Sequence, residues 1–267
     1  MWQDSLLSVC FDRPPLTTPA RLEVQLSGRL SYTDAMYALC DRTLRIIGVR
    51  VHRDKRNFSI ILEDVAKIEE IRRQSLGSPH GVPHTLGIRQ RTESCALNLH
   101  ISFIIAWLCR PVLQNHHSPE SRTGVQLRLR EICNKNLIEC IRAFVQLHSL
   151  STLASRSWAV IHNGLSSALL LSLLGQTATN SQVQKLQGQI IHILSTEPND
   201  RGGQGKDVHN NIELSLAHTR AVAALRSLYN DQSNNSAQNS AAGNGGPNQE
   251  ASENQFHRAL NTTVPLQ

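Results

Sequence analysis

Aromatic residues are scarce in this 267-residue chain and make up 4% of the sequence. Hydrophobic residues as a whole reach an ordinary 40%, so leucine and isoleucine must supply most of any core. Such a composition favours helices, because sheets are rich in β-branched and aromatic residues. The length suits one large domain or two small ones, and we expect an all-α domain over residues 1–229 followed by a polar tail over 230–267.

Motifs that signal catalysis or cofactor binding are also missing. The sequence has no G-x-S-x-G elbow, no H-E-x-x-H helix and no dinucleotide glycine fingerprint, and the glycine-rich segment 200–206 lacks the spacing of a phosphate loop. Its six cysteines form no C-x-x-C pair and lie inside apolar helical runs, so we expect reduced core thiols. We therefore expect no enzyme, and no catalytic, cofactor-binding or metal-ligating residues in this chain.

No unbroken apolar run reaches the roughly 18 to 20 residues of a membrane span. The closest stretch, 96–113, contains His100, Arg110 and Pro111, and we expect a buried helix there and no membrane partner. The net charge of +6 is a mild basic excess that suits a polyanion but does not demand one. The basic cluster 51–56 is interpreted as a solvated loop, with a nuclear import signal or a phosphate contact as the alternatives.

The most informative stretch is AFVQLHSLSTLASRSWAVIHNGLSSALLLSLLG, residues 143–175. It predicts two apolar helical runs that join at 149–155 and end at a glycine. Apolar residues recur at three- and four-residue steps after Trp158 and then widen into a nearly continuous apolar surface, which is typical of a central helix. Gly175 is predicted to occupy the left-handed position just past a helix end.

Helical periodicity and capping residues predict the neighbouring elements. We expect charged residues of helix 58–76 to form a solvated face with local ion pairs, and His100 to be a hydrogen-bonded core histidine. The near-heptad face from Ile132 to Leu147 favours packing within the chain. Residues 230–255 contain no Ile, Leu, Val or Tyr and are predicted to be disordered. The expected helices are one opened by Ser31, then 58–76, 92–113, 124–148, one capped at 179–181, and 212–229.

Three blocks carry a family resemblance: WQDSLLSVCFDRPP at 2–15, LNLHISFIIAWLCRP at 97–111, and the stretch 143–175. In this order they resemble the later part of the middle homology region of fungal binuclear zinc cluster transcription factors, and the resemblance covers roughly residues 1–228. It implies an irregular all-α domain that restrains or transmits activity in a nuclear regulator of RNA polymerase II transcription. The expected partners are the transcription machinery, a corepressor or a small-molecule effector. The family-motif positions are Asp12, Arg13, Pro14, Arg156, Ser157, Trp158, His162 and Gly175.

The family reads DNA through an N-terminal zinc cluster of six cysteines, C-x2-C-x6-C repeated with one altered gap, which is not in this sequence. Zinc and DNA binding are therefore expected only of that cluster, and no cofactor is expected here. The chain starts close to the first block, so we expect a fragment, a truncated gene product or a protein that works without its own DNA-reading segment. Asp12 and Arg13 beside the prolines are expected to form a buried ion pair or to cap a neighbouring helix.

Two other functions stay open at this point. One is a helical enzyme or small-molecule binding protein with His100, His148 or His162 in an internal pocket, although the sequence identifies no carboxylate to orient them. The other is a stand-alone interaction scaffold that uses the face from Ile132 to Leu147.

Overall fold

Every regular element in the computed structural model is an α-helix, so the expected all-α class is confirmed for the residues that the structure describes. These are residues 2–11, 13–17, 28–51, 57–76, 87–113, 123–151, 156–195 and 214–241. The helices are α1 (Trp2–Phe11), α2 (Tyr32–Val51), α3 (Phe58–Leu76), α4 (Ile88–Leu113), α5 (Gly124–Leu150), α6 (Trp158–Leu173), α7 (Gln176–Thr179), α8 (Ser181–Ser195) and α9 (Leu216–Ala241).

The chain divides into two compact units, residues 1–164 and 165–267. The division falls inside α6, just after Gly164, so one apolar helix contributes its first half to unit 1 and its second half to unit 2. The expected single domain over 1–229 stays a prediction.

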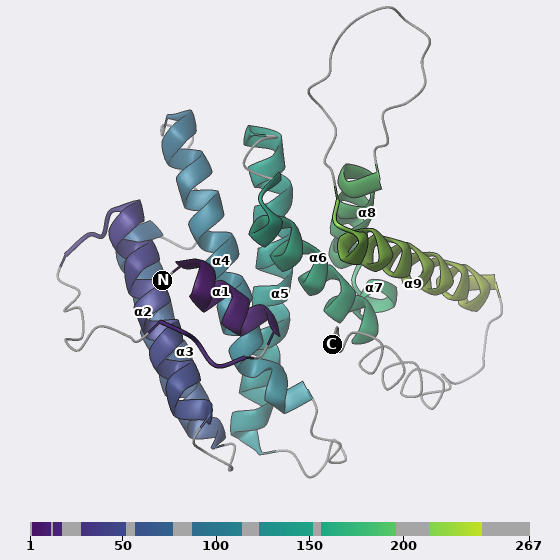
Figure 1. The fold of residues 1–267 in the computed structure, drawn as a ribbon. Coiled ribbons are helices and arrows are strands. Elements are labelled where there is room, and N and C mark those ends of the chain that lie inside the picture. Colours follow the sequence, from purple (N-terminus) through teal and green to yellow (C-terminus); the bar gives the residue numbers. More distant parts are fainter. Residues whose placement is uncertain are drawn as a thin grey trace, which may run out of the picture. The chain divides into compact units, whose positions relative to one another are not determined.

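Unit 1 is built on the paired helices α4 and α5, which lie side by side (Figure 1). Helix α3 packs against both, α2 packs against α3 and α4, and α1 packs against α2. The core is almost entirely aliphatic, as the scarcity of aromatics predicts. The largest fully buried side chains are Phe103, Phe144, Leu39, Leu44, Ile68, Ile71, Leu97, Leu99, Ile101, Ile105, Leu108 and Leu129.

Helix α4 is the most apolar long helix of unit 1. By length and composition alone it would be able to cross a membrane, but 78% of its most apolar window is buried inside the protein, and core helices often meet the same criteria. The expectation of a buried helix is confirmed. The helix continues past Arg110 and Pro111 to Leu113 rather than ending there.

Side-chain caps explain where several helices start. Ser31 accepts a hydrogen bond from the Asp34 backbone N–H, and its hydroxyl donates to the Asp34 carboxylate. Thr123 and Gln126 form a reciprocal capping box at the start of α5. Asn180 accepts from two backbone N–H groups of the first turn of α8, as predicted for the segment 179–181.

Unit 2 contains the end of α6 together with α7, α8 and α9, and α7, α8 and α9 pack on one another. Gly175 has a φ of 70° between α6 and α7, so the predicted left-handed position is confirmed. The fully buried Gln187 ties α8 to the other helices: its amide nitrogen donates to the Ala168 carbonyl and the Ser172 hydroxyl, and its amide oxygen accepts from Thr177.

Helix α9 continues to Ala241, so the predicted start of disorder at Asn230 is too early. A helix that has already formed can extend through Asn, Ser and Gln at little cost per residue, because nucleation is the expensive step. The rest of the expected tail, the loop with His80 and His84, the pair His116 and His117, the basic residues 52–56 and the segment 200–206 lie outside the described residues.

Candidate functional site

A deeply buried polar contact in unit 1 joins His100 on α4 to Asn163 on α6. The Asn163 side-chain nitrogen lies 3.0 Å from His100 Nδ1, and both residues are almost fully buried. Because an amide nitrogen can only donate, Nδ1 accepts, and the neutral ring carries its proton on Nε2. The Cys140 thiol on α5 lies 3.5 Å from the Asn163 carbonyl oxygen, so the contact ties three helices together.

Burial lowers the pKa of His100 to about 3. The imidazole is therefore neutral at physiological pH, because charging it would require removing a cation from water. The prediction of a hydrogen-bonded core histidine is confirmed. Such a group stabilises a fold and is a poor general acid at neutral pH, because it does not carry the proton it would have to give.

The aromatic residues of the second and third sequence blocks meet next to this contact. The rings of Trp158 and His162 are stacked, with centroids 5.0 Å apart and an interplanar angle of 14°. His162 also meets Phe103 edge to face at 5.9 Å, and the Arg110 guanidinium carbon lies 5.8 Å from the centroid of the Phe103 ring. Two family-motif positions, Trp158 and His162, are thus brought together with α4.

A glycine permits α6 to approach α5 closely at this point. A Cβ added to Gly164 would lie 2.8 Å from Phe144 Cδ2 and 2.9 Å from Phe144 Cγ. Such distances are too short for carbon atoms, and the fully buried Phe144 ring has little room to move. Gly164 therefore allows the first half of α6 to pack closely against α5 at Phe144.

The first block forms a local ion pair rather than joining this centre. Arg13 pairs with Asp4 at 3.1 Å, and Asp4 also accepts from the Thr17 backbone N–H at 2.7 Å. Partial burial opposes ionisation of Asp4, but the backbone hydrogen bonds from Thr17 and Leu16 and the charge of Arg13 together lower its pKa. The expected ion pair of Arg13 thus has Asp4 as a partner, and Asp12 lies outside the described residues.

The other family-motif positions have separate locations. Pro14 is exposed, and Arg156 lies half-buried in a short turn before α6. Ser157 is exposed, and its backbone carbonyl accepts the Ile161 N–H at the start of α6. Gly175 belongs to unit 2. The structure therefore brings Trp158 and His162 together.

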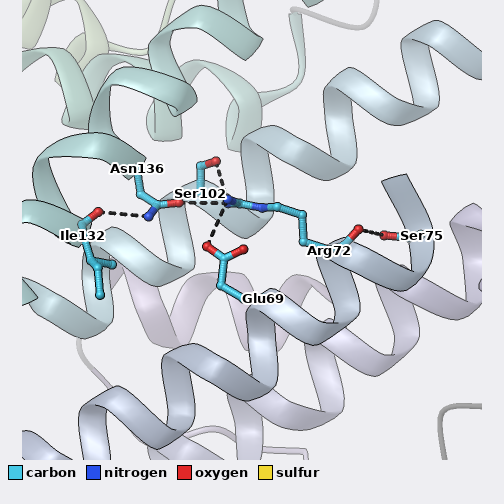
Figure 2. Close-up of polar contacts among 6 residues, drawn as sticks. All are labelled: Glu69, Arg72, Ser75, Ser102, Ile132 and Asn136. Carbon is cyan, nitrogen blue, oxygen red and sulfur yellow. Dashed lines mark hydrogen bonds and ion pairs between the residues drawn. The ribbon is translucent and has the colours of Figure 1, made fainter. Parts of the chain in front are cut away.

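A second polar centre, which was not predicted from the sequence, surrounds Arg72 on α3 (Figure 2). One terminal nitrogen of Arg72 donates to Ser102 at 3.0 Å and to Asn136 at 2.8 Å, and the other donates to Glu69 at 3.1 Å. The Asn136 amide nitrogen in turn donates to the Ile132 carbonyl. Three helices, α3, α4 and α5, thus meet at one guanidinium.

The expectation of a solvated face on α3 is wrong for Arg72, although the expected local ion pair is present between Glu69 and Arg72. Its side chain is only 14% exposed, whereas that of the neighbouring Arg73 is 69% exposed and pairs with Glu70 on the same helix. Burial lowers the pKa of Arg72, and the charges of Glu69 and Glu139 oppose that shift. Ser102 and Asn136 are uncharged polar residues among the apolar residues of α4 and α5. Because buried polar groups need hydrogen-bond partners, these two residues were the sequence feature from which a buried partner such as Arg72 could have been predicted.

The cysteines are free thiols, and Cys40, Cys95, Cys109, Cys133 and Cys140 are buried. Burial raises the pKa of Cys10, Cys40 and Cys133 to about 12, so these groups stay protonated and unreactive. The expectation of free thiols in the core is confirmed for the five buried cysteines, whereas Cys10 is half-buried. Within the described ranges, His, Cys, Asp and Glu side chains form no group of three or more that would hold a metal ion.

The face from Ile132 to Leu147 is turned inward. Cys133, Leu137, Cys140, Phe144 and Leu147 are all buried, in agreement with packing of this face inside the chain. A scaffold function that uses this face would therefore require unit 1 to open.

In comparisons with known proteins, no family model, no curated protein and no solved structure matches this chain.

Proposed function

We propose that this chain is the helical regulatory part of a fungal transcription factor of the binuclear zinc cluster type, acting in the nucleus on RNA polymerase II transcription. In this proposal it binds other proteins of the transcription machinery or a corepressor, or a small-molecule effector, and is not itself an enzyme. Binding of DNA and zinc is assigned to a cysteine cluster outside this sequence.

The observation that carries the proposal is the meeting of two resemblance blocks in unit 1. His100 and Phe103 come from the second block, and Asn163 and His162 come from the third. The pairs His100–Asn163 and Phe103–His162 are in contact, although each pair is separated by about sixty residues in sequence.

The chemistry of the described polar groups also supports a regulatory rather than a catalytic role. His100, Asn163, Arg72, Ser102 and Asn136 are used to join helices. Buried polar contacts between helices give a domain a defined arrangement that a partner or effector can bias.

The proposal is tested by tethering. The chain is fused to an unrelated DNA-binding domain in a fungal cell, and transcript from a reporter with the matching binding site is compared with that driven by the DNA-binding domain alone. The fused chain is expected either to raise or to lower the amount of reporter transcript. Asn163→Leu should reduce the change, whereas Lys135→Ala, at an exposed side chain of α5, should leave it intact.

A fusion that is folded and present in the nucleus but has no effect on the reporter would contradict the proposal. Full-length transcripts of the locus provide a second test, because the proposal expects them to encode an upstream C-x2-C-x6-C cluster. Transcripts that start at Met1 would rule out DNA binding by the route of the family.

A further inference from the structure

The last turn of α3 carries the sequence Arg72-Arg73-Gln74-Ser75-Leu76. We propose that Ser75 is a phosphorylation site for a basophilic serine/threonine protein kinase, and that the buried contacts of Arg72 control its modification. This regulation goes beyond the proposed function and does not depend on it.

The two arginines supply the recognition chemistry. A kinase that selects arginine two and three positions before the serine binds the guanidinium groups with carboxylates, since substrate choice by kinases relies on charge pattern. Arg73 is already accessible: its side chain is 69% exposed, and its pair with Glu70 is a surface ion pair that contributes little stability. Arg72 is the restrained member, because it is held by Ser102 and Asn136.

The hydroxyl of Ser75 lies where a small local opening would expose it. Ser75 is half-buried, and its hydroxyl donates to the Ile71 carbonyl at 2.7 Å. It also donates more weakly to the Arg72 carbonyl at 3.3 Å (Figure 2). Both acceptors belong to the same helix end, which stops at Leu76. Terminal helical turns open at low free-energy cost, so the serine becomes available without unfolding of unit 1.

The reaction uses Mg-ATP as the phosphoryl donor. Ser75 Oγ attacks the γ-phosphorus, a new O–P bond forms, and the bond between that phosphorus and the β,γ-bridging oxygen breaks. ADP leaves with that oxygen, and the hydroxyl proton passes to a carboxylate base of the kinase. No oxidation or reduction is involved.

The modification would act on the Arg72 centre. A phosphate adds about −1.5 to −2 charge at the C-terminus of a helix, where the helix dipole is already negative, so the last turn of α3 is destabilised. Arg72 lies three residues before Ser75 on the same side of the helix, and a phosphate would compete with Ser102 and Asn136 for its guanidinium. Phosphorylation is therefore expected to loosen α3 from α4 and α5.

The test uses the full chain with Mg-ATP and the catalytic subunit of a serine kinase that selects two arginines before the serine. The intact mass is followed over time, and the modified residue is found by peptide mapping. We expect one phosphoryl group on Ser75, none there in Ser75→Ala, and a clearly lower rate in Arg73→Ala. Arg73 is exposed, so its replacement leaves the core unchanged.

Ser102→Ala tests the control by Arg72. It removes one bond to the guanidinium, and the rate at Ser75 is expected to rise about tenfold, the factor that corresponds to about 1.4 kcal/mol. Ser149 is the matched control serine: it is exposed, lies in the last turn of α5 and donates to the Gln146 carbonyl at 2.7 Å, but no arginine occupies the three preceding positions. It should remain unmodified.

Hydrogen exchange of α3 provides the second readout. Faster exchange in the phosphorylated chain than in the unmodified chain is expected, whereas Ser75→Ala treated with kinase should exchange like the untreated protein. Phosphorylation of other serines while Ser75 stays unmodified would overturn the assignment of Ser75 as the site. So would a rate of Ser75 phosphorylation in Arg73→Ala equal to that in the parent chain. The proposed control of Ser75 by the contacts of Arg72 would be overturned by either of two results. One is an equal rate of Ser75 phosphorylation in Ser102→Ala and the parent chain, and the other is unchanged hydrogen exchange of α3 after phosphorylation.

Discussion

His100 on α4 accepts a hydrogen bond from the side chain of Asn163, which lies 63 residues later in the chain on α6. The bond is buried and joins α4 to α6, two helices that are separated in the chain by α5. Its geometry leads to the first two predictions.

Asn163→Leu is expected to destabilise the protein by about 1 to 3 kcal/mol, because a buried acceptor on His100 loses its donor. Denaturation by urea, followed by circular dichroism, measures the change. Adding His100→Phe to this variant should recover part of the loss, because both partners are then apolar. A double variant that is no more stable than Asn163→Leu alone would contradict the prediction.

Stability is expected to fall as the pH is lowered from about 6.5 toward 5. The folded-state pKa of His100 is depressed to about 3, so the unfolded chain binds a proton in this range and the folded chain does not. Burial also lowers the pKa of His148 and His218, which adds to the effect in the same direction. Each fully protonating histidine contributes a slope of up to about 1.4 kcal/mol per pH unit.

Urea midpoints measured at several pH values between 7 and 5 check this expectation. Most carboxylates remain ionised over that range, so the histidines dominate the change. His100→Phe should give a shallower dependence than the parent chain. An identical slope in the two proteins would show that His100 is charged in the folded state or takes up no proton on unfolding.

Gly164→Ala is expected to cost about 1 to 3 kcal/mol, because its new Cβ would overlap the buried ring of Phe144. Gly48 on α2 is the matched control, since nothing lies within 4 Å of a Cβ added there. Gly48→Ala should stabilise the protein by about 0.5 to 1 kcal/mol through its higher helix propensity. Thermal unfolding of the two variants compares them, and changes of the same sign would argue against the close packing of α5 and α6.

Gly175→Ala is expected to destabilise unit 2 by about 1 kcal/mol, because a residue with a Cβ is strained at a φ of 70°. Gly175→Asn should cost less, since asparagine adopts the left-handed conformation more readily than alanine. A steric clash is not the cause of the expected loss of stability, because nothing lies within 4 Å of a Cβ built at this position. Equal stability of the alanine and asparagine variants, measured by denaturant unfolding, would contradict the backbone explanation.

Local sequence was sufficient to predict several elements of the fold. Val183, Leu186, Ile190 and Leu194 recur at three- and four-residue steps, the period of one helix face, and all four side chains are buried on α8. Capping at Ser31 and the left-handed Gly175 were predicted as well. These features depend on interactions within a few residues, which is why the amino-acid sequence determines them.

Only the tertiary structure decided what the polar residues of the interior do. Arg72 and Arg73 are adjacent and chemically identical, yet one is 14% exposed and joins three helices while the other is 69% exposed and forms a local pair. The sequence determined that α3 has both apolar and charged residues. Which arginine becomes buried depends on where Ser102 and Asn136 lie, and those positions are set by the packing of α4 on α5, through contacts between residues far apart in the chain.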